Sequence, residues 1–491
     1  MSYSSRIKYA SGANSCVEAG RRKFLALAFV AFLVLPVIMS QRAFADGLFQ
    51  ENLPPASLGE RQASLFVKIN PPILTSDTKQ NAFMQFRLFN VKDNSTIKFT
   101  TFAITITKGT DPKATPLLTE VFHTESGLLT LKIQPQPGPV TIAGTREQLL
   151  NSYVADPGGT INIRGPILLE GGLYHFSIML LTVDNIRNLF ASGSEPVFDT
   201  YLSVGDVSAQ NVQFEGKSYP TTIISYYDKV KDFSFDAKTK TYSWAMPFDW
   251  DGNRLQAAAN VFVHEEIKVP KSFAGVGDVS AYDAKVNGKE ITGRMLAVDP
   301  FSSETEQILH FLINKNDVIE MAKSMPAGSS QMTFSFAPSS DTGDKTSGEI
   351  ATDTGGVHVK LNWNPGQMGA GKEETVGLQF VDAFAGNDIT SDVTYDIKAV
   401  DKQGKEVFSA NDQVAKGGAG QQKMTFPADA NYNIEVKVKS IQKEGQAPDT
   451  TRNGIARGLV VVPEFPAGTA IAAAGVVGAV IAASRIVRRQ K

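Results

Sequence analysis

The residues best suited to metal chemistry in this sequence are its five histidines, His123, His175, His264, His310 and His358. The segment His264-Glu265-Glu266 comes closest to a metal-binding motif, but it lacks the second histidine four residues on that HExxH requires. His310 stands among leucines and a phenylalanine, in a segment expected to be helical, which favours a packed or surface histidine over a metal ligand. We therefore predict no metal site. The sequence leaves open whether distant histidines converge in space.

The densest aromatic segment has the composition of a sugar-binding platform. Its candidate residues are Trp244, Phe248, Asp249, Trp250 and Asp251. Aromatic faces cover the C–H surface of a sugar, while carboxylates accept hydrogen bonds from its hydroxyl groups. However, Tyr242, Trp244 and Met246 alternate along the chain, as residues do on the buried face of a strand. We favour this core interpretation and keep the platform as the alternative.

Two acidic stretches have residue types that could bind a cation. Asp249-x-Asp251-Gly252-Asn253 resembles part of a calcium loop, but the glycine comes too early for an EF-hand and no glutamate closes the loop. Asp341, Asp344 and Asp353 lie in a polar stretch that we expect to be solvated. We therefore expect no cofactor, with Ca²⁺ at these carboxylates as the alternative.

Composition excludes several classes of protein. The only cysteine is Cys16, so the sequence lacks a disulfide scaffold, Cys-based zinc and Fe–S sites, and a cysteine nucleophile beyond the N-terminal segment. The formal net charge of −2 argues against nucleic acid as a partner. The sequence contains no GxSxG, GxxxxGK[ST] or GxGxxG motif. We therefore predict that the protein is not an enzyme.

The N-terminus has the features of a signal peptide over residues 1–45. A basic group at 21–23 precedes the apolar run Phe24–Met39, and Ala43 and Ala45 form a small-x-small cleavage site before Asp46. An uncleaved anchor is the alternative. The Arg-Arg-Lys-Phe-Leu stretch is also similar to a twin-arginine signal, so the choice between Sec and twin-arginine export stays open.

The C-terminus has the features of a single membrane span. The apolar run Ala467–Ala483 has the length of a short transmembrane helix. The positive-inside rule places the basic tail in the cytoplasm and residues 46–462 outside the cell. The tail residues that would act as this cytoplasmic anchor are Arg485, Arg488, Arg489 and Lys491.

The short motif Pro463-Glu464-Phe465 precedes this span and basic tail. Together, the three features resemble the tripartite sorting signals of the PEF-CTERM type, which exosortase or archaeosortase transpeptidases read. The resemblance implies cleavage near the motif, attachment of the new C-terminus to a membrane lipid or surface component, and an archaeal surface protein. It covers only residues 461–491, and Pro466 replaces the glycine of the most familiar subtype.

Between the two ends, short alternating runs of β-branched and aromatic residues predict strands. Capping-box patterns predict helices at 145–153 and within 303–325. The expected fold is mainly β, with tandem immunoglobulin- or fibronectin-like β-sandwiches, an α+β middle unit and one C-terminal transmembrane helix. The expected units are a leader (46–62), a β-sandwich (62–205), an α+β domain (206–340), a flexible linker (341–356) and an Ig-like β-sandwich (357–460).

These features predict an exported, membrane-anchored protein on the extracellular face of the cell membrane. We expect a non-catalytic role in binding, adhesion or envelope structure, with an envelope glycan or surface protein as partner. Asn94, in the sequon Asn94-Ser95-Thr96, is the candidate glycosylation site. Two alternatives remain: an outward-facing accessory subunit of a membrane enzyme complex, and a secreted hydrolase acting on polysaccharide or peptide.

Overall fold

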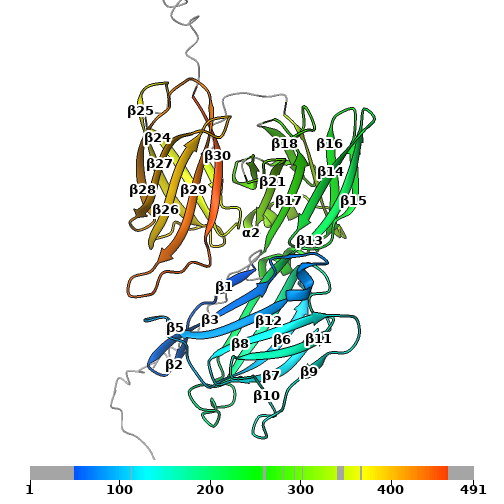
Figure 1. Cartoon of the computed structure of the whole chain (residues 1–491), viewed down its shortest axis with the longest axis vertical. Helices are drawn as coiled ribbons and strands as arrows, with labels where there is room; N and C mark the ends of the chain where they lie inside the picture. The colour runs from blue at the N-terminus through cyan, green and yellow to red at the C-terminus, as the bar shows by residue number, and fades with distance from the viewer. Residues whose placement is uncertain are drawn as a thin grey trace, which may run out of the picture. The chain divides into compact units, whose positions relative to one another are not determined.

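The computed structural model describes residues 49–111, 113–257, 261–279, 281–291, 293–300, 302–339, 348–364 and 368–462. Within these ranges the chain is mainly β, and its strands pair into five sheets (Figure 1). The prediction of a mainly β fold is confirmed. Among the described residues, no helix is long and apolar enough to span a membrane. The predicted signal peptide, sorting motif, transmembrane run and cytoplasmic tail lie outside the described residues.

The first two sheets enclose a common core, which we call the first sandwich. Alternate residues of the paired strands point into it, including Val67, Phe86, Ile104 and Phe176. One sheet has the order β1-β3-β5-β8-β11-β9, with β2 paired to β3. Its strands are β1 (Gln50–Asn52), β2 (Ala56–Leu58), β3 (Arg61–Asn70), β5 (Phe83–Asn90), β8 (Leu128–Pro135), β9 (Thr141–Ala143) and β11 (Thr160–Gly165). The 3-10 helix η1 (Thr78–Asn81) precedes β5.

The facing sheet continues beyond the first sandwich and contains ten strands. Its order is β10-β7-β6-β12-β13-β14-β17-β21-β20, with β4 paired to β13. The strands are β4 (Ile73–Leu74), β6 (Thr100–Lys108), β7 (Leu118–Thr124), β10 (Tyr153–Val154), β12 (Gly172–Thr182), β13 (Val197–Phe214), β14 (Lys217–Ser225), β17 (Phe262–Pro270), β20 (Leu296–Asp299) and β21 (Glu306–Asn314).

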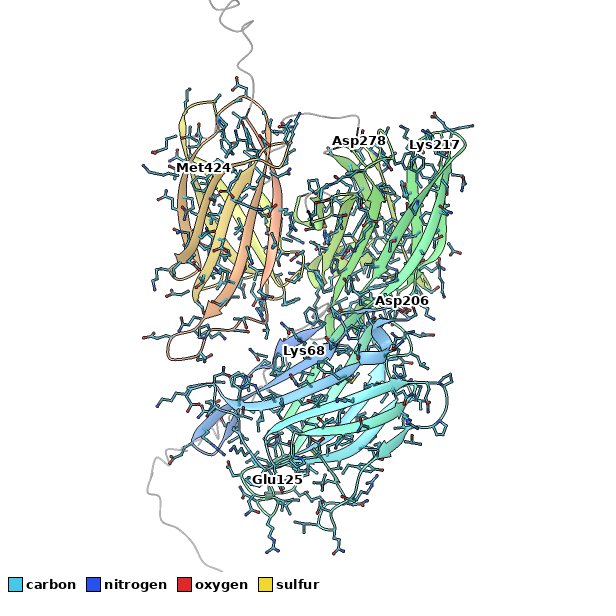
Figure 2. The ribbon with its side chains drawn as sticks, viewed as in Figure 1. Lys68, Glu125, Asp206, Lys217, Asp278 and Met424 are labelled. Carbon is cyan, nitrogen blue, oxygen red and sulfur yellow. The ribbon has the colours of Figure 1, made fainter. Side chains whose placement is uncertain are left out.

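Strand β13 joins two cores because it is unusually long. Leu202 and Val204 in its first half are buried in the first core, whereas Val212 near its end is buried in the second. Asp206, labelled in Figure 2, lies between these halves, and its carboxylate accepts a hydrogen bond from the amide of Gly171 at 3.0 Å. The predicted boundary between residues 205 and 206 therefore falls within a continuous strand.

The middle sandwich packs the far half of the ten-stranded sheet against a five-stranded sheet. The order of the smaller sheet is β15-β16-β22-β18-β19. Its strands are β15 (Lys231–Asp236), β16 (Thr241–Pro247), β18 (Tyr282–Val286), β19 (Lys289–Ile291) and β22 (Gln331–Pro338). The shared core is rich in aromatic rings, and Trp244 stacks on Phe334 with ring centroids 5.2 Å apart. The described helices of this unit are α1 (Gly252–Ala257), η2 (Gly293–Met295) and α2 (Lys315–Ala322).

Two helix predictions require correction. Residues Glu306–Asn314 form strand β21, and only Lys315–Ala322 of the predicted 303–325 segment is α-helical. The apolar run fits a strand because eight of its nine residues are buried, so both faces of β21 are covered. The segment 145–153 is not helical either: the Glu147 carboxylate accepts the amides of Leu149 and Leu150 within a turn.

The last two sheets enclose a third core, in what we call the third sandwich. One sheet has the order β23-β24-β25-β28 and the other β27-β26-β29-β30. Their strands are β23 (Glu349–Ala351), β24 (Val357–Asn364), β25 (Glu373–Asp382), β26 (Asp392–Val400), β27 (Glu406–Ala415), β28 (Ala419–Thr425), β29 (Asn431–Gln442) and β30 (Gly454–Val461). Part of the segment expected to be a linker forms β23, because Ile350 and Ala351 are buried.

Candidate functional site

The aromatic residues of the predicted sugar platform lie in the middle core. Trp244, Phe248 and Trp250 are 2%, 3% and 7% exposed. The indole of Trp244 donates to Glu265 Oε2 at 3.3 Å, and that of Trp250 donates to the carbonyl of Gln331 at 2.8 Å. Their rings are thus covered by protein, which agrees with the core interpretation that the alternation favoured.

The two aspartates of that segment are exposed and engaged by neighbouring groups. Asp249 forms an ion pair with Arg254 at 2.7 Å. Asp251 accepts the backbone amide of Arg254 at 2.7 Å, at the start of α1. Calcium at this loop stays a prediction.

Asn94 lies on an exposed turn between β5 and β6. Its backbone has a φ of 58°, a conformation that asparagine tolerates better than most residues. The Arg87 guanidinium donates to the Asn94 side-chain oxygen at 2.8 Å. Glycosylation of Asn94 stays a prediction.

The structure brings together three groups that the sequence keeps apart, His264, Glu266 and His310. We call them the histidine cluster. His264 and Glu266 are two apart on β17 and therefore point to the same face of the sheet. His310 on β21 is the cross-strand partner of Glu266. One possible ligand atom from each residue lies within 4.8 Å of those of the other two.

The geometry of the histidine cluster is closely defined. His264 Nε2 lies 3.1 Å from His310 Nδ1. Glu266 Oε1 pairs with Lys268 Nζ at 3.0 Å, and Glu266 Oε2 lies 3.5 Å from the Tyr226 hydroxyl. The Tyr226 ring stacks on His264 at 4.6 Å with an interplanar angle of 10°. The aromatic stack and the sheet backbone together fix the orientation of these groups.

Burial sets the electrostatics of the histidine cluster. Desolvation, followed by repulsion from His310, lowers the pKa of His264 well below its ordinary value. Burial, followed by the charge of Glu266, raises the pKa of the Tyr226 hydroxyl. The imidazole of His264 is therefore neutral at physiological pH, with a lone pair available to a ligand. His310 Nε2 is buried without a hydrogen-bond partner in the described structure.

The same sheet face carries an apolar cluster. Phe262 on β17 and Leu312 on β21 pack with residues of the third sandwich, and the rings of Phe262 and Phe384 meet edge-on at 6.2 Å. The Asn314 side-chain amide donates to the carbonyl of Ala383 at 3.4 Å. Since Val263 and Ile267 face the middle core, both faces of β17 are buried.

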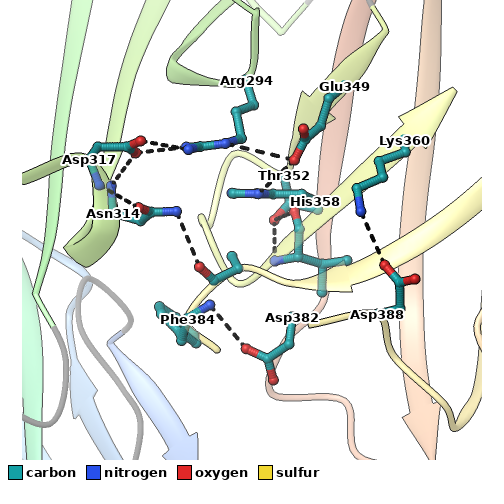
Figure 3. A network of polar contacts seen from close by, with 12 residues as sticks. Arg294, Asn314, Asp317, Glu349, Thr352, His358, Lys360, Asp382, Phe384 and Asp388 are labelled. Carbon is teal, nitrogen blue, oxygen red and sulfur yellow. Dashed lines mark hydrogen bonds and ion pairs between the residues drawn. The ribbon is translucent and has the colours of Figure 1, made fainter. Parts of the chain in front are cut away.

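A polar network lies beside this apolar cluster (Figure 3). Arg294 donates to both carboxylate oxygens of Asp317 at 2.6 and 2.7 Å, and its Nε lies 3.7 Å from Glu349. His358 Nδ1 lies 3.3 Å from Glu349 Oε1. The hydrogen bond from His358 lowers the pKa of Glu349. The network thus links α2 to β23 and β24.

A buried ion pair also links the middle and third sandwiches. Arg457 on β30 lies 3.1 Å from Asp299 on β20, and both side chains are under 10% exposed. The Arg457 guanidinium also donates to the Ser302 hydroxyl at 3.1 Å. A cavity of about 540 Å³ adjoins this pair and is lined by Lys271, Ile350 and other residues of both sandwiches.

Sequence reasoning missed the histidine cluster for a specific reason. His264 and His310 are 46 residues apart. The apolar run around His310 also predicts a helix, in which the pairing with β17 has no place. If both segments are strands, His264 and Glu266 point to one face of the sheet, and so do His310 and Leu312. This alternation is the signal in the sequence that could have indicated the cluster. The register that places His310 opposite Glu266 is a tertiary property.

Comparison with known proteins yields little. No protein-family model and no curated protein matches the sequence. Two solved structures of α2-macroglobulin, a Salmonella mutant and the native E. coli protein, match at 8% and 9% identity, each with a TM-score of 0.18. Each match covers 83% of this chain but only 33% and 23% of the respective macroglobulin chains. At this TM-score the similarity supports no assignment of fold or function.

Proposed function

We propose that this chain is an exported, membrane-anchored cell-surface protein that acts as a non-catalytic binding or envelope-structural module. The observation that carries the proposal is a series of three sandwich cores, in which β13 is shared by the first two. Within the proposal, the sandwiches are of the immunoglobulin or fibronectin kind. Asp46 would follow the signal cleavage site, and Pro463-Glu464-Phe465 would direct sorting.

Buried contacts between the middle and third sandwiches support the proposal. Arg457 pairs with Asp299, and Phe262 packs on Phe384. A module held by buried ion pairs and aromatic contacts presents its outer surface in a fixed orientation, which suits display of a binding surface or support of an envelope.

The first test is to map the terminal peptides of the protein purified from its native membranes, by mass spectrometry. The proposal expects a start at Asp46 and an end near Pro463–Phe465. An intact Lys491 would overturn sorting and favour an accessory subunit of a membrane complex, which should also co-purify with partners in fixed stoichiometry.

A matched pair of variants sharpens this test. Glu464→Ala changes the motif and should retain the Lys491 peptide, whereas Glu444→Ala changes an exposed glutamate of the third sandwich and should be processed as the wild type is. Turnover of polysaccharide or peptide by the purified protein would instead overturn the non-catalytic assignment.

A further inference from the structure

The histidine cluster offers the ligand set of a transition-metal site. Two imidazoles and one carboxylate are the three protein ligands of a common type of zinc site, with a fourth position left to water. We propose that His264, Glu266 and His310 together bind one divalent first-row transition-metal ion, of which Zn²⁺ is the representative. This site is independent of the proposed surface role.

The distances suit such an ion. Nitrogen ligands at 2.0–2.1 Å from a tetrahedral Zn²⁺ lie about 3.3 Å from one another. His264 Nε2 and His310 Nδ1 are 3.1 Å apart. One ligand atom of each residue, Glu266 included, lies within 4.8 Å of those of the other two, so the carboxylate must move towards the nitrogens for all three to bind one ion.

The surroundings hold the ligands in place. The backbone of β17 and β21 fixes the spacing of the three residues, and the Tyr226 ring stacks on His264. The Tyr226 hydroxyl, near Glu266 Oε2, is the kind of outer partner that orients a metal-binding carboxylate. A ligand set built on paired strands loses little conformational entropy when the ion binds.

His310 is a buried histidine with one ring nitrogen unsatisfied within the described structure. His310 is 6% exposed, and its Nε2 has no hydrogen-bond partner among the described residues. A buried polar atom without a partner is rare in proteins.

Lys268 competes with the ion for Glu266. Its ammonium pairs with Glu266 Oε1 at 3.0 Å and competes for the carboxylate. The Lys268 side chain is 26% exposed, so it can turn to solvent when an ion arrives. Removing the ammonium should therefore strengthen metal binding, which a histidine pair that serves only packing would not show.

The test is Zn²⁺ titration of the full chain, without a histidine tag, by isothermal titration calorimetry at pH 7.5. The expected result is one ion per chain with a Kd below about 1 µM, and a rise in Tm with Zn²⁺ concentration. His264→Gln and His310→Gln should each weaken binding at least 100-fold. His175→Gln is the matched control, since His175 pairs with Asp199 at 2.9 Å on a different part of the sheet.

Two further measurements keep the test decisive if a histidine variant folds poorly. Lys268→Met should tighten Zn²⁺ binding several-fold, whereas Lys285→Met, at an exposed position on β18, should leave it unchanged. Co²⁺ bound to the wild type should give the visible absorption of a four-coordinate site. Absence of stoichiometric uptake by the wild type, or uptake that follows His175, would overturn the proposal.

Discussion

His264 and His310 meet across neighbouring strands, with Nε2 of the first 3.1 Å from Nδ1 of the second. They lie on the face of β17 and β21 that does not line the middle core, yet both are buried. The other face of β17 carries Val263 and Ile267 into that core. This part of the sheet is therefore covered on both sides, and its second face combines an apolar cluster with titratable groups.

Gly355 lies close against the Phe262 ring on that second face. Its φ is +71°, and a Cβ added there would lie 1.9 Å from the ring of Phe262. We expect Gly355→Ala to lower the free energy of unfolding by about 2–4 kcal/mol, through backbone strain and overpacking together. Gly371 is the matched control, because its φ is also +71° and an added Cβ would meet nothing within 4 Å.

Gly371→Ala should therefore show the strain alone, about 1 kcal/mol. Urea unfolding followed by tryptophan fluorescence measures both variants. Equal decreases in the free energy of unfolding of the two variants would show that crowding against Phe262 adds nothing to the backbone strain.

The buried pair of Arg457 and Asp299 should matter far more than an exposed pair. Their side chains are 7% and 3% exposed and 3.1 Å apart. Arg457→Ala takes the guanidinium away from a buried carboxylate, so we expect a loss of about 3–5 kcal/mol in the free energy of unfolding. Lys423→Ala breaks the exposed pair with Glu373, at 2.8 Å, and should cost at most about 1 kcal/mol. Similar losses for the two variants in urea unfolding would contradict this.

Glu51 should make stability depend on pH. Burial raises its pKa from the usual 4.5 to about 8, while a hydrogen bond from Thr200 and the charge of Arg452 oppose the rise, and those of Asp449 and Asp382 add to it. The folded state therefore binds a proton that the unfolded state releases between pH 4.5 and 8. The contribution of the protonated Glu51 carboxyl to the free energy of unfolding is complete below pH 4.5. This contribution is lost as the pH rises through this interval, by up to about 1.4 kcal/mol per pH unit.

Glu51→Gln replaces the carboxyl group by a neutral group of similar shape. The free energy of unfolding of this variant should fall less steeply between pH 5 and 8 than that of the wild type. Glu60→Gln, at an exposed position in the turn between β2 and β3, should leave the slope unchanged. An E51Q variant with the wild-type slope in unfolding titrations would show that Glu51 is ionised in the folded protein.

The sequence was sufficient for strands with one buried face. The alternation of Phe83–Phe89 and Val357–Trp363 predicted strands that the structure has as β5 and β24. It was not sufficient for β21, because a strand buried on both faces has the same continuous apolar run as a buried helix. The capping box there is formed by Asn314 and Asp317, eleven residues after the predicted start at residue 303.

The histidine cluster could not be predicted for a related reason. The spacing of His264 and Glu266 is visible in the sequence, but the register that sets Glu266 opposite His310 arises from the pairing of β17 with β21. The aromatic segment, by contrast, can be interpreted from the sequence alone, because the alternation of Tyr242, Trp244 and Met246 indicates a core strand.

Variants of Trp244 and Asp251 together separate core packing from sugar binding. It is 2% exposed, stacks on Phe334 and meets Phe311 edge-on at 5.4 Å. Trp244→Ala should lower the free energy of unfolding by about 3–5 kcal/mol. Asp251→Asn should change it by less than about 0.5 kcal/mol, because asparagine caps the start of α1 as well as aspartate does.

Glycan-array binding should likewise be unchanged in Asp251→Asn, because the rings that a sugar would stack on are covered in the folded protein. The comparison depends on Asp251→Asn rather than on Trp244→Ala, since loss of the core would abolish any binding indirectly. Loss of glycan binding in Asp251→Asn at unchanged stability would restore the sugar platform and contradict a purely structural role for this segment.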